Sequence, residues 1–99
     1  MNKIIAVGRT TKDIDVRTTK NGKTVASFVL ASDRRDGGTD FFSCFAWEGT
    51  ARLLEQYVHK GDQIVIWGRL STRAYEKNGE NRIAYEIVVD EVTFVGSRA

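Results

Sequence analysis

Two Asn-Gly dipeptides, each lying between stretches of β-favouring residues, place the strongest constraint on how this chain can fold. Asn21-Gly22 separates residues 16–19 from residues 23–31, and Asn78-Gly79 separates residues 71–77 from residues 82–89. Both residues of an Asn-Gly pair tolerate the positive φ angles of a type I′ turn, which joins two antiparallel strands. The sequence therefore predicts two β-hairpins.

Further β-favouring segments complete the pattern. Residues 3–7 form a short apolar run that we expect to end at Gly8, and residues 64–70 are predicted to form a buried strand with a bulge or bend at Gly68. Residues 92–95 are expected to close the sheet. The chain has no proline, which fits long uninterrupted strands because proline removes a hydrogen-bond donor from the ladder.

The apolar spacing changes after residue 47. Apolar side chains at positions 53, 54, 57 and 58 follow the period of a helix. We expect Thr50 to cap the start of this helix and Gly61 to stop it in a left-handed conformation. The segment predicts one helix of about three turns.

The order of these elements predicts an all-β fold. About five long strands with one helix between the third and the fourth is the order of an OB-fold, a five-stranded, partly open Greek-key barrel. Its 99 residues are expected to form a single domain over residues 1–99. An SH3-like barrel or a plain meander would have similar strand content, and both remain alternatives at this stage.

Composition and motifs exclude several functions. Cys44 is the only cysteine and His59 the only histidine, so an intrachain disulfide and a four-ligand Cys/His zinc site are excluded. The chain lacks a phosphate-binding glycine loop, a GxSxG elbow and an HExxH motif. It has no secretory signal and no apolar run long enough to span a membrane. We expect a soluble, cytoplasmic protein that is not an enzyme and needs no cofactor.

One enzymatic alternative rests on two short acidic pairs. Asp13 with Asp15, and Asp90 with Glu91, could hold a divalent metal ion in a small nuclease. Each pair lies beside a predicted turn or strand end, where exposed carboxylates are common. Incubation of labelled strands with Mg²⁺ or Mn²⁺ would distinguish a nuclease from a binding protein.

Aromatic residues share one face of the strand over residues 41–47. Strand alternation places Phe41, Phe45 and Trp47 on one face, and Phe42 and Cys44 on the other. The core is expected to be filled by other residues, namely Phe28, Leu30, Ile64, Ile66, Ile83 and Ile87. Phe41 and Trp47 are therefore predicted to be exposed and to stack on bases, whereas Phe45 is expected in the core. Burial of these rings in the core is the alternative.

Basic residues accompany these rings. On the first strand of the second hairpin, Arg73, Tyr75 and Lys77 share one face, which is therefore cationic and contains a ring. Arg34 and Arg35 lie in a polar loop over residues 32–39, either as solvated side chains or as ligands of phosphate groups. Arginine is suited to both phosphate binding and stacking. The net charge of +2 permits a polyanionic partner without requiring one.

The surroundings of three other residues complete the sequence-based expectations. The parity of Trp67 matches that of Tyr75, but a bulge at Gly68 would shift the register, so Trp67 is either an exposed platform or part of the core or an interface. Phe42 is expected in the core or in a subunit contact. Cys44 reads as a small buried hydrophobic residue.

With these residues in view, the chain resembles the bacterial and phage single-stranded DNA-binding proteins of the homotetrameric OB-fold type. The resemblance covers nearly the whole chain in the family's order and spacing. The matching segments include VASFVLA (residues 25–31), TDFFSCFAW (residues 39–47), KG (residues 60–61) and GRLSTRAY (residues 68–75). The three stacking aromatics of the family correspond to Phe41, Trp47 and Tyr75.

The resemblance implies a protein that coats single-stranded DNA with little sequence preference in replication, recombination and repair. It also implies self-association as a homotetramer. The residues expected to contact DNA are Phe41, Trp47 and Tyr75 by stacking, and Arg17, Arg34, Arg35, Arg73 and Lys77 through phosphates. An alternative is a primosome-type OB adaptor that acts mainly through protein contacts and binds bare oligonucleotides weakly.

The sequence departs from the family pattern at three places. The chain stops at residue 99 without the acidic C-terminal tip through which family members recruit other proteins, so partners recruited in that way are not expected. The loop over residues 33–39 is short and has no aromatic residue. Glu48 stands where a basic residue is frequent, which weakens the expected contacts just after Trp47.

Overall fold

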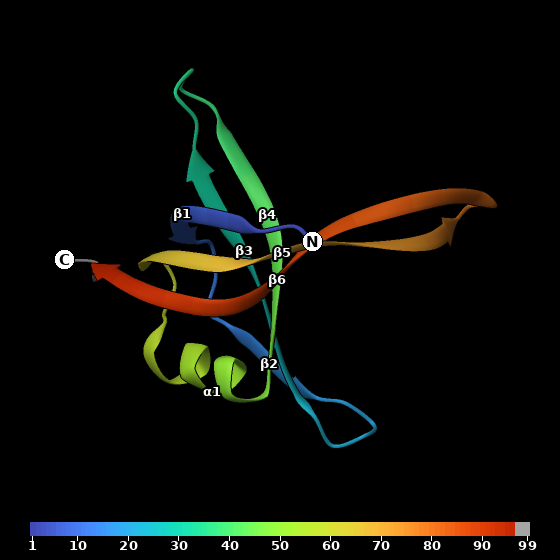
Figure 1. The fold of residues 1–99 in the computed structure, drawn as a ribbon, viewed down its shortest axis with the longest axis horizontal. Helices are drawn as coiled ribbons and strands as arrows, with labels where there is room; N and C mark the ends of the chain where they lie inside the picture. Colours follow the sequence, from blue (N-terminus) through green and yellow to red (C-terminus); the bar gives the residue numbers. More distant parts are fainter. Residues whose placement is uncertain (97–99) are drawn as a thin grey trace.

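One sheet of six strands, curled until its two sides meet, forms most of the computed structural model, which describes residues 1–96. Figure 1 shows the helix packed beneath the curled sheet and hairpins projecting from it, among them the last hairpin of the chain, drawn in orange. In chain order the elements are β1 (Ile4–Thr10), β2 (Asp15–Thr18), β3 (Thr24–Asp33), β4 (Thr39–Trp47), α1 (Glu48–Tyr57), β5 (Gln63–Lys77) and β6 (Glu80–Gly96).

Closure of the sheet makes it a barrel. The strand order is β1-β5-β6-β4-β3-β2, and β1 also pairs with β3 through Arg9–Ala31 and Thr10–Leu30. All neighbouring strands are antiparallel except β4 and β6, which form a short parallel pair. The expected all-β OB-fold barrel is confirmed: β2 is a four-residue addition to the five long strands, and α1 lies between the third and fourth of them.

The two predicted hairpins are present, with different turns. Asn78 and Gly79 both have positive φ angles, 52° and 78°, as a type I′ turn requires. In the first hairpin, Gly22 has a φ of 80° but Asn21 is not left-handed. There the turn is wider and is closed by hydrogen bonds from Thr19 N–H to the Lys23 carbonyl and from Gly22 N–H to the Thr19 carbonyl.

Several expected strand ends were wrong. β1 passes through Gly8, which is buried against the Ala31 carbonyl, and ends two residues later. β5 and β6 each run unbroken over the segments that the sequence analysis divided. The predicted bulge at Gly68 is confirmed, because the register of β5 against β6 shifts between Trp67 and Gly68.

The helix is present, but neither of its predicted end signals was right. α1 begins directly at the end of β4, with Trp47 as N-cap residue and no side-chain cap. Thr50 therefore lies within the helix, and its hydroxyl donates to the Asp90 carbonyl at 3.5 Å. At the other end, Val58 is the C-cap residue and its N–H donates to Leu54. Gly61 is left-handed, with a φ of 87°, but it shapes the turn that follows the helix.

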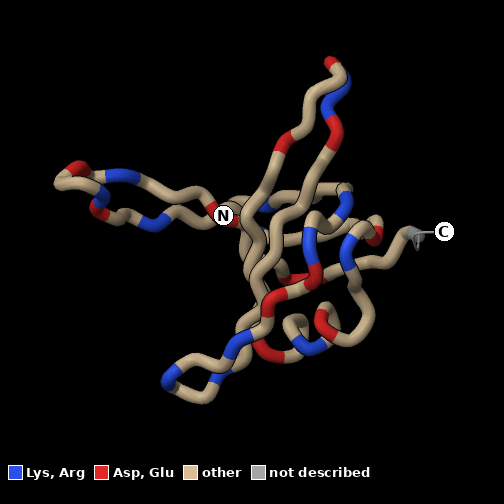
Figure 2. The backbone as a smooth tube through the Cα atoms, turned by 180° about the vertical axis from the view of Figure 1, so that it is seen from behind, with Lys and Arg blue, Asp and Glu red and all other residues tan. Residues whose placement is uncertain are grey.

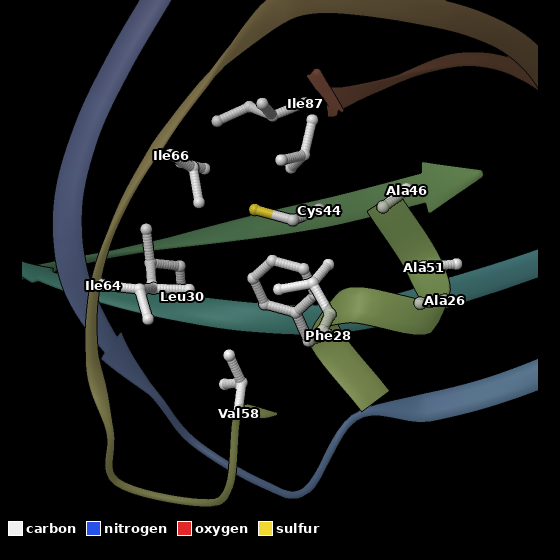
Figure 3. Packing of buried hydrophobic residues seen from close by; sticks show 12 residues of the cluster. Ala26, Phe28, Leu30, Cys44, Ala46, Ala51, Val58, Ile64, Ile66 and Ile87 are labelled. Carbon is white, nitrogen blue, oxygen red and sulfur yellow. The ribbon is translucent and has the colours of Figure 1, made fainter. Parts of the chain in front are cut away.

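The core lies between the sheet and α1 (Figure 3). Five of the six expected core residues are buried, namely Phe28, Leu30, Ile64, Ile66 and Ile87, and Ala51 and Leu54 contribute from α1. Ile83 was wrongly assigned to the core and is 57% exposed. It belongs to the arm, which we define as residues 72–85 of the β5–β6 hairpin. The arm extends beyond the barrel (Figure 1), so no second layer covers it.

Cys44 is fully buried within this core, as expected. Burial raises the pKa of its thiol to about 12, because a thiolate would lose its hydration there. The thiol therefore stays protonated at neutral pH and acts as a small apolar side chain. Among the described residues, no helix is both long and apolar enough to cross a lipid bilayer.

Gly68→Ala should destabilise the fold. A Cβ at this position would collide with the Val88 carbonyl, so the substitution should cost about 1–3 kcal/mol of unfolding free energy, as overpacking usually does. Gly49→Ala is the matched control, because Gly49 lies in α1 with open space around it and alanine is the better helix former by about 1 kcal/mol. Chemical denaturation measures both, and equal stability of the two variants would contradict the close approach at Gly68.

Candidate nucleic-acid interface

The side chains at odd-numbered positions of β4 define an outward sheet surface, here called the aromatic face. Residues directly opposite each other in antiparallel strands point to the same side of a sheet. Trp47 lies opposite Val25, which lies opposite Arg17 of β2. The aromatic face therefore extends from β4 across β3 to β2.

The same face continues in the other direction onto β6 and β5. Phe45 is paired with Val88 of β6, and Val88 is paired with Arg69 of β5. Beyond Arg69, alternation along β5 keeps Arg73 and Tyr75 on this side. The register thus unites rings and cations from β2, β4 and β5 on one surface that crosses five strands, although these residues are far apart in the sequence.

The predicted stacking rings are exposed on this surface. Phe41 is 66% exposed, Trp47 is 44% exposed and Tyr75 is 36% exposed, so none of the three belongs to the core cluster. Phe45 is half-buried between them. The surface available for base stacking is therefore discontinuous, with rings at both ends of β4 and one on the arm.

Arg73 is held in place beside Tyr75. Its guanidinium lies 5.6 Å from the centre of the Tyr75 ring, and its Nη2 atom donates to Glu86 Oε2 at 3.1 Å. The hydrogen bond to Glu86 is the main cause of the raised pKa of Arg73. The ring and the charge are therefore presented together on the arm, whose alternating charges are visible in Figure 2.

The other predicted cations differ in their surroundings. Arg17 forms an exposed ion pair with Asp15 at 3.2 Å. Arg35 and Lys77 have no ion-pair partner among residues 1–96 and are exposed, in the β3–β4 turn and at the end of β5 respectively. These two cations are available to a phosphate without any rearrangement.

Arg34 is directed away from the aromatic face. Its guanidinium donates to Asp36 at 3.1 Å and to Asp40 at 3.2 Å, and these hydrogen bonds raise its pKa. Asp40 precedes Phe41 and so points to the opposite side of β4. A phosphate contact by Arg34 remains a prediction, and it requires the guanidinium to leave two carboxylates.

The sequence analysis missed two groups of residues here. Lys20 and Lys23 lie in the exposed β2–β3 hairpin next to Arg17, and the lysines flanking Asn21-Gly22 were the available signal. Close by, a groove of about 330 Å³ lies between residues 11–15 and the β3–β4 pair. Phe45 is one of the residues that line this groove. Both features extend the aromatic face at its β2 side.

Glu48 has a structural role in this surface. Its Oε1 atom accepts a hydrogen bond from the Thr24 N–H at 3.1 Å, and its Oε2 atom accepts one from Arg52 at 3.5 Å. Glu48 also has a φ of 51°, which lets α1 start directly after Trp47. The carboxylate thus joins β3, β4 and α1 at the base of Trp47.

The two aromatic residues left open by the sequence are both half-buried. Trp67 shares the outward side of β5 with Arg69, because the bulge adds its extra residue to β6 and leaves the alternation of β5 unchanged. Trp67 is opposite Ile5 on the outer side of the β1–β5 pair. Phe42 points to the side opposite Phe41 and packs against the core.

The first acidic pair of the nuclease alternative, Asp13 with Asp15, has other partners. Asp13 accepts a hydrogen bond from the Lys60 N–H at 2.9 Å, and Asp15 is paired with Arg17. Within residues 1–96, no three His, Cys, Asp or Glu side chains cluster closely enough to form a metal site.

A small OB-fold barrel with exposed rings and cations on one face is an architecture that binds nucleic acid. The model of the Single-strand binding protein family matches residues 1–95. The chain belongs to this family, which confirms the resemblance inferred from the sequence.

Curated relatives agree with this assignment. The chain is 42% identical to the single-stranded DNA-binding protein of Clostridium tetani, over 96% of this chain and 70% of that protein. It is 38% identical to the single-stranded DNA-binding protein of Bacillus cereus, over 99% of this chain and 62% of that protein. It is 37% identical to the single-stranded DNA-binding protein of Clostridium perfringens, over 98% of this chain and 67% of that protein. The chain thus spans about two thirds of the length of these relatives.

Truncation of the exposed rings should leave the fold intact. Phe41→Ala should change the unfolding free energy by no more than about 0.5 kcal/mol, as is usual for surface substitutions. Phe28→Ala is the matched control on the neighbouring strand, because Phe28 is buried and its truncation should cost about 3–5 kcal/mol. Thermal or chemical unfolding of both variants measures this, and comparable losses would place Phe41 in the core.

Proposed function

We propose that this chain binds and coats single-stranded DNA with little sequence preference, in replication, recombination and repair. The observation that carries the proposal is the aromatic face, on which Phe41, Trp47 and Tyr75 are exposed beside arginines. The names of the curated relatives support it. A cytoplasmic location belongs to the same proposal, because the ligand is found there.

Binding uses two kinds of contact, base stacking and phosphate neutralisation. Phe41, Trp47 and Tyr75 offer flat apolar rings on which unpaired bases stack, and stacking tolerates any base because every base has a π face. Arg17, Arg35, Arg73 and Lys77, with Arg34 after rearrangement, neutralise phosphates between the stacked bases. No contact in this scheme reads a base edge, so sequence preference is weak.

Single-stranded DNA should quench Trp47 emission, and duplex DNA should not, because paired bases have no free face to offer a ring. A fluorescence titration with a dT oligonucleotide and with a duplex of equal length measures this difference. Trp47→Phe should remove the quenching while retaining binding, since phenylalanine still stacks. Quenching that persists in this variant would assign the signal to Trp67, and equal quenching by both forms of DNA would contradict stacking.

Binding should also depend on each ring and on salt. Phe41→Ala and Tyr75→Ala should each weaken binding by about 1–3 kcal/mol.

The logarithm of the binding constant should fall with the logarithm of the salt concentration, with a slope of about −0.7 for each phosphate neutralised. Strong binding to bare oligonucleotides would also exclude an adaptor that acts mainly through protein contacts.

We further propose that the chain assembles as a homotetramer, for which one edge of the barrel supplies the support. Among residues 1–96, the Ile4–Gly8 part of β1 pairs with β5 alone. An exposed strand edge is a template for pairing with another chain. Beside it, Ile5, Val7, Leu70 and Tyr85 are exposed and line a groove of about 900 Å³. Assembly would place several aromatic faces on one DNA strand and raise affinity through effective concentration.

Charges on the β1 edge should dissociate the assembly. Ile5→Lys with Val7→Lys should convert the protein to a monomer of 11.1 kDa and weaken binding to long single strands, because lysine at an edge opposes strand pairing. Leu53→Lys, on an exposed position of α1, is the matched control and should leave the assembly unchanged. Sedimentation equilibrium measures the mass, and a monomeric parent protein with tight binding would refute the assembly and its role.

A further inference from the structure

Two arginines of the aromatic face already hold a carboxylate of the same face. Arg73 Nη2 lies 3.1 Å from Glu86 Oε2, and Arg17 Nε lies 3.2 Å from Asp15 Oδ2. Asp15 lies opposite Ser27, which lies opposite Phe45, and Glu86 lies opposite Ser71 on β5. Both carboxylates therefore point toward the surface that carries the rings.

Carboxylate and phosphate use the same donors of a guanidinium group. Each accepts charge-assisted hydrogen bonds from the planar fork of N–H groups. A DNA phosphate that binds Arg73 must share these donors with Glu86 or displace it, and a carboxylate that stays beside the phosphate repels it. The aromatic face therefore holds a carboxylate of the protein at each position where a DNA phosphate is expected to bind.

These two ion pairs are not needed to pair the strands. β2 and β3 are paired through their backbones at Asp15 and Arg17, and β5 and β6 at Arg73 and Glu86. The Arg17–Asp15 pair is exposed on both sides, and such pairs contribute little to folding stability. Asp36 in the β3–β4 turn is different, because it also accepts the Gly38 N–H at 2.8 Å and so shapes that turn.

Glu86 is the more confined of the two carboxylates. Its side chain is only 17% exposed, whereas that of Asp15 is 52% exposed. The confined position keeps the charge of Glu86 close to Arg73, between the arm and the barrel. Displacement of Glu86 is therefore expected to affect binding at least as strongly as displacement of Asp15.

We propose that Glu86 and Asp15 are intramolecular competitors of DNA phosphate, which exchange with it at Arg73 and Arg17. The inference rests on the proposed binding of single-stranded DNA and adds to it the residues that limit affinity. When the strand is released, each carboxylate returns to its arginine. Arg73 and Arg17 are therefore paired with an anion in both the bound and the free protein. The competitors thereby favour dissociation of the strand.

The test removes one negative charge at a time while keeping the shape of the side chain. Glu86→Gln and Asp15→Asn should each tighten binding to a dT oligonucleotide by about two- to fivefold at fixed moderate salt, the range expected for an exposed ion pair. Glu55→Gln, on the exposed surface of α1, changes the net charge equally and should give a clearly smaller gain. Thermal unfolding of each variant confirms that it is folded.

A double-mutant cycle separates competition from general electrostatics. If Glu86 acts through Arg73, Glu86→Gln should have no effect on affinity in an Arg73→Ala background. A gain of the same size in both backgrounds would overturn the proposal, because it would reflect net charge alone. Weaker binding by Glu86→Gln and Asp15→Asn would also overturn it, since the carboxylates would then orient the arginines for DNA.

Binding by the parent protein separates failure of the competition from failure of the proposed function. Parent protein that binds the oligonucleotide, with variants that bind no more tightly than Glu55→Gln, would refute the competition and leave the proposed function standing. Parent protein that does not bind single-stranded DNA at all would refute the proposed function, and this inference with it.

Discussion

The close approach of Gly68 to the Val88 carbonyl lets one pair of strands serve two parts of the molecule. Before this point Trp67 is paired with Glu91, and after it Gly68 is paired with Val89, so Asp90 is left as an extra residue in β6. Such a bulge bends and twists a strand pair. On one side of the bend β5 pairs with β1 and completes the barrel. On the other side β5 and β6 leave the barrel as the arm that carries Arg73 and Tyr75.

Alternation along β4 provides the second constraint. The same short strand supplies Cys44 and Ala46 to the core and Phe41 and Trp47 to the outer surface. A shift of one residue in the pairing of β3 with β4 would bury the exposed rings and expose the core. The hydrophobic requirement of folding thus fixes the register that also sets the aromatic face, so the fold and the surface cannot vary independently.

This coupling explains which features could be predicted from the sequence. Hairpin turns follow from Asn-Gly, and the exposed side of β4 follows from a period of two, because both are local properties of the chain. The position of Ile83 could not be found in this way, since a strand that continues past the barrel keeps the same apolar pattern as one that stays inside it. The N-cap was missed because Glu48 enters the helix from a left-handed conformation, which glutamate rarely adopts.

Partners of long charged side chains were the least predictable features. The guanidinium of Arg34 turns to Asp40 on the far side of β4, and that of Arg73 turns to Glu86 across the hairpin. These choices depend on which strands are neighbours in space, and a linear sequence does not contain that information. The sequence could therefore identify the cations of the surface but not which of them are available.

The junction between β4 and α1 has a consequence for the entropy of binding. Trp47 is both the last residue of β4 and the N-cap residue of α1, so the helix follows the strand without an intervening loop. Glu48 holds this junction to β3 through the Thr24 N–H. The backbone beneath the ring is thus ordered before any ligand arrives, and preorganised groups lose little conformational freedom on association. At this end of the surface, the ordering that accompanies binding falls almost entirely on the nucleic acid.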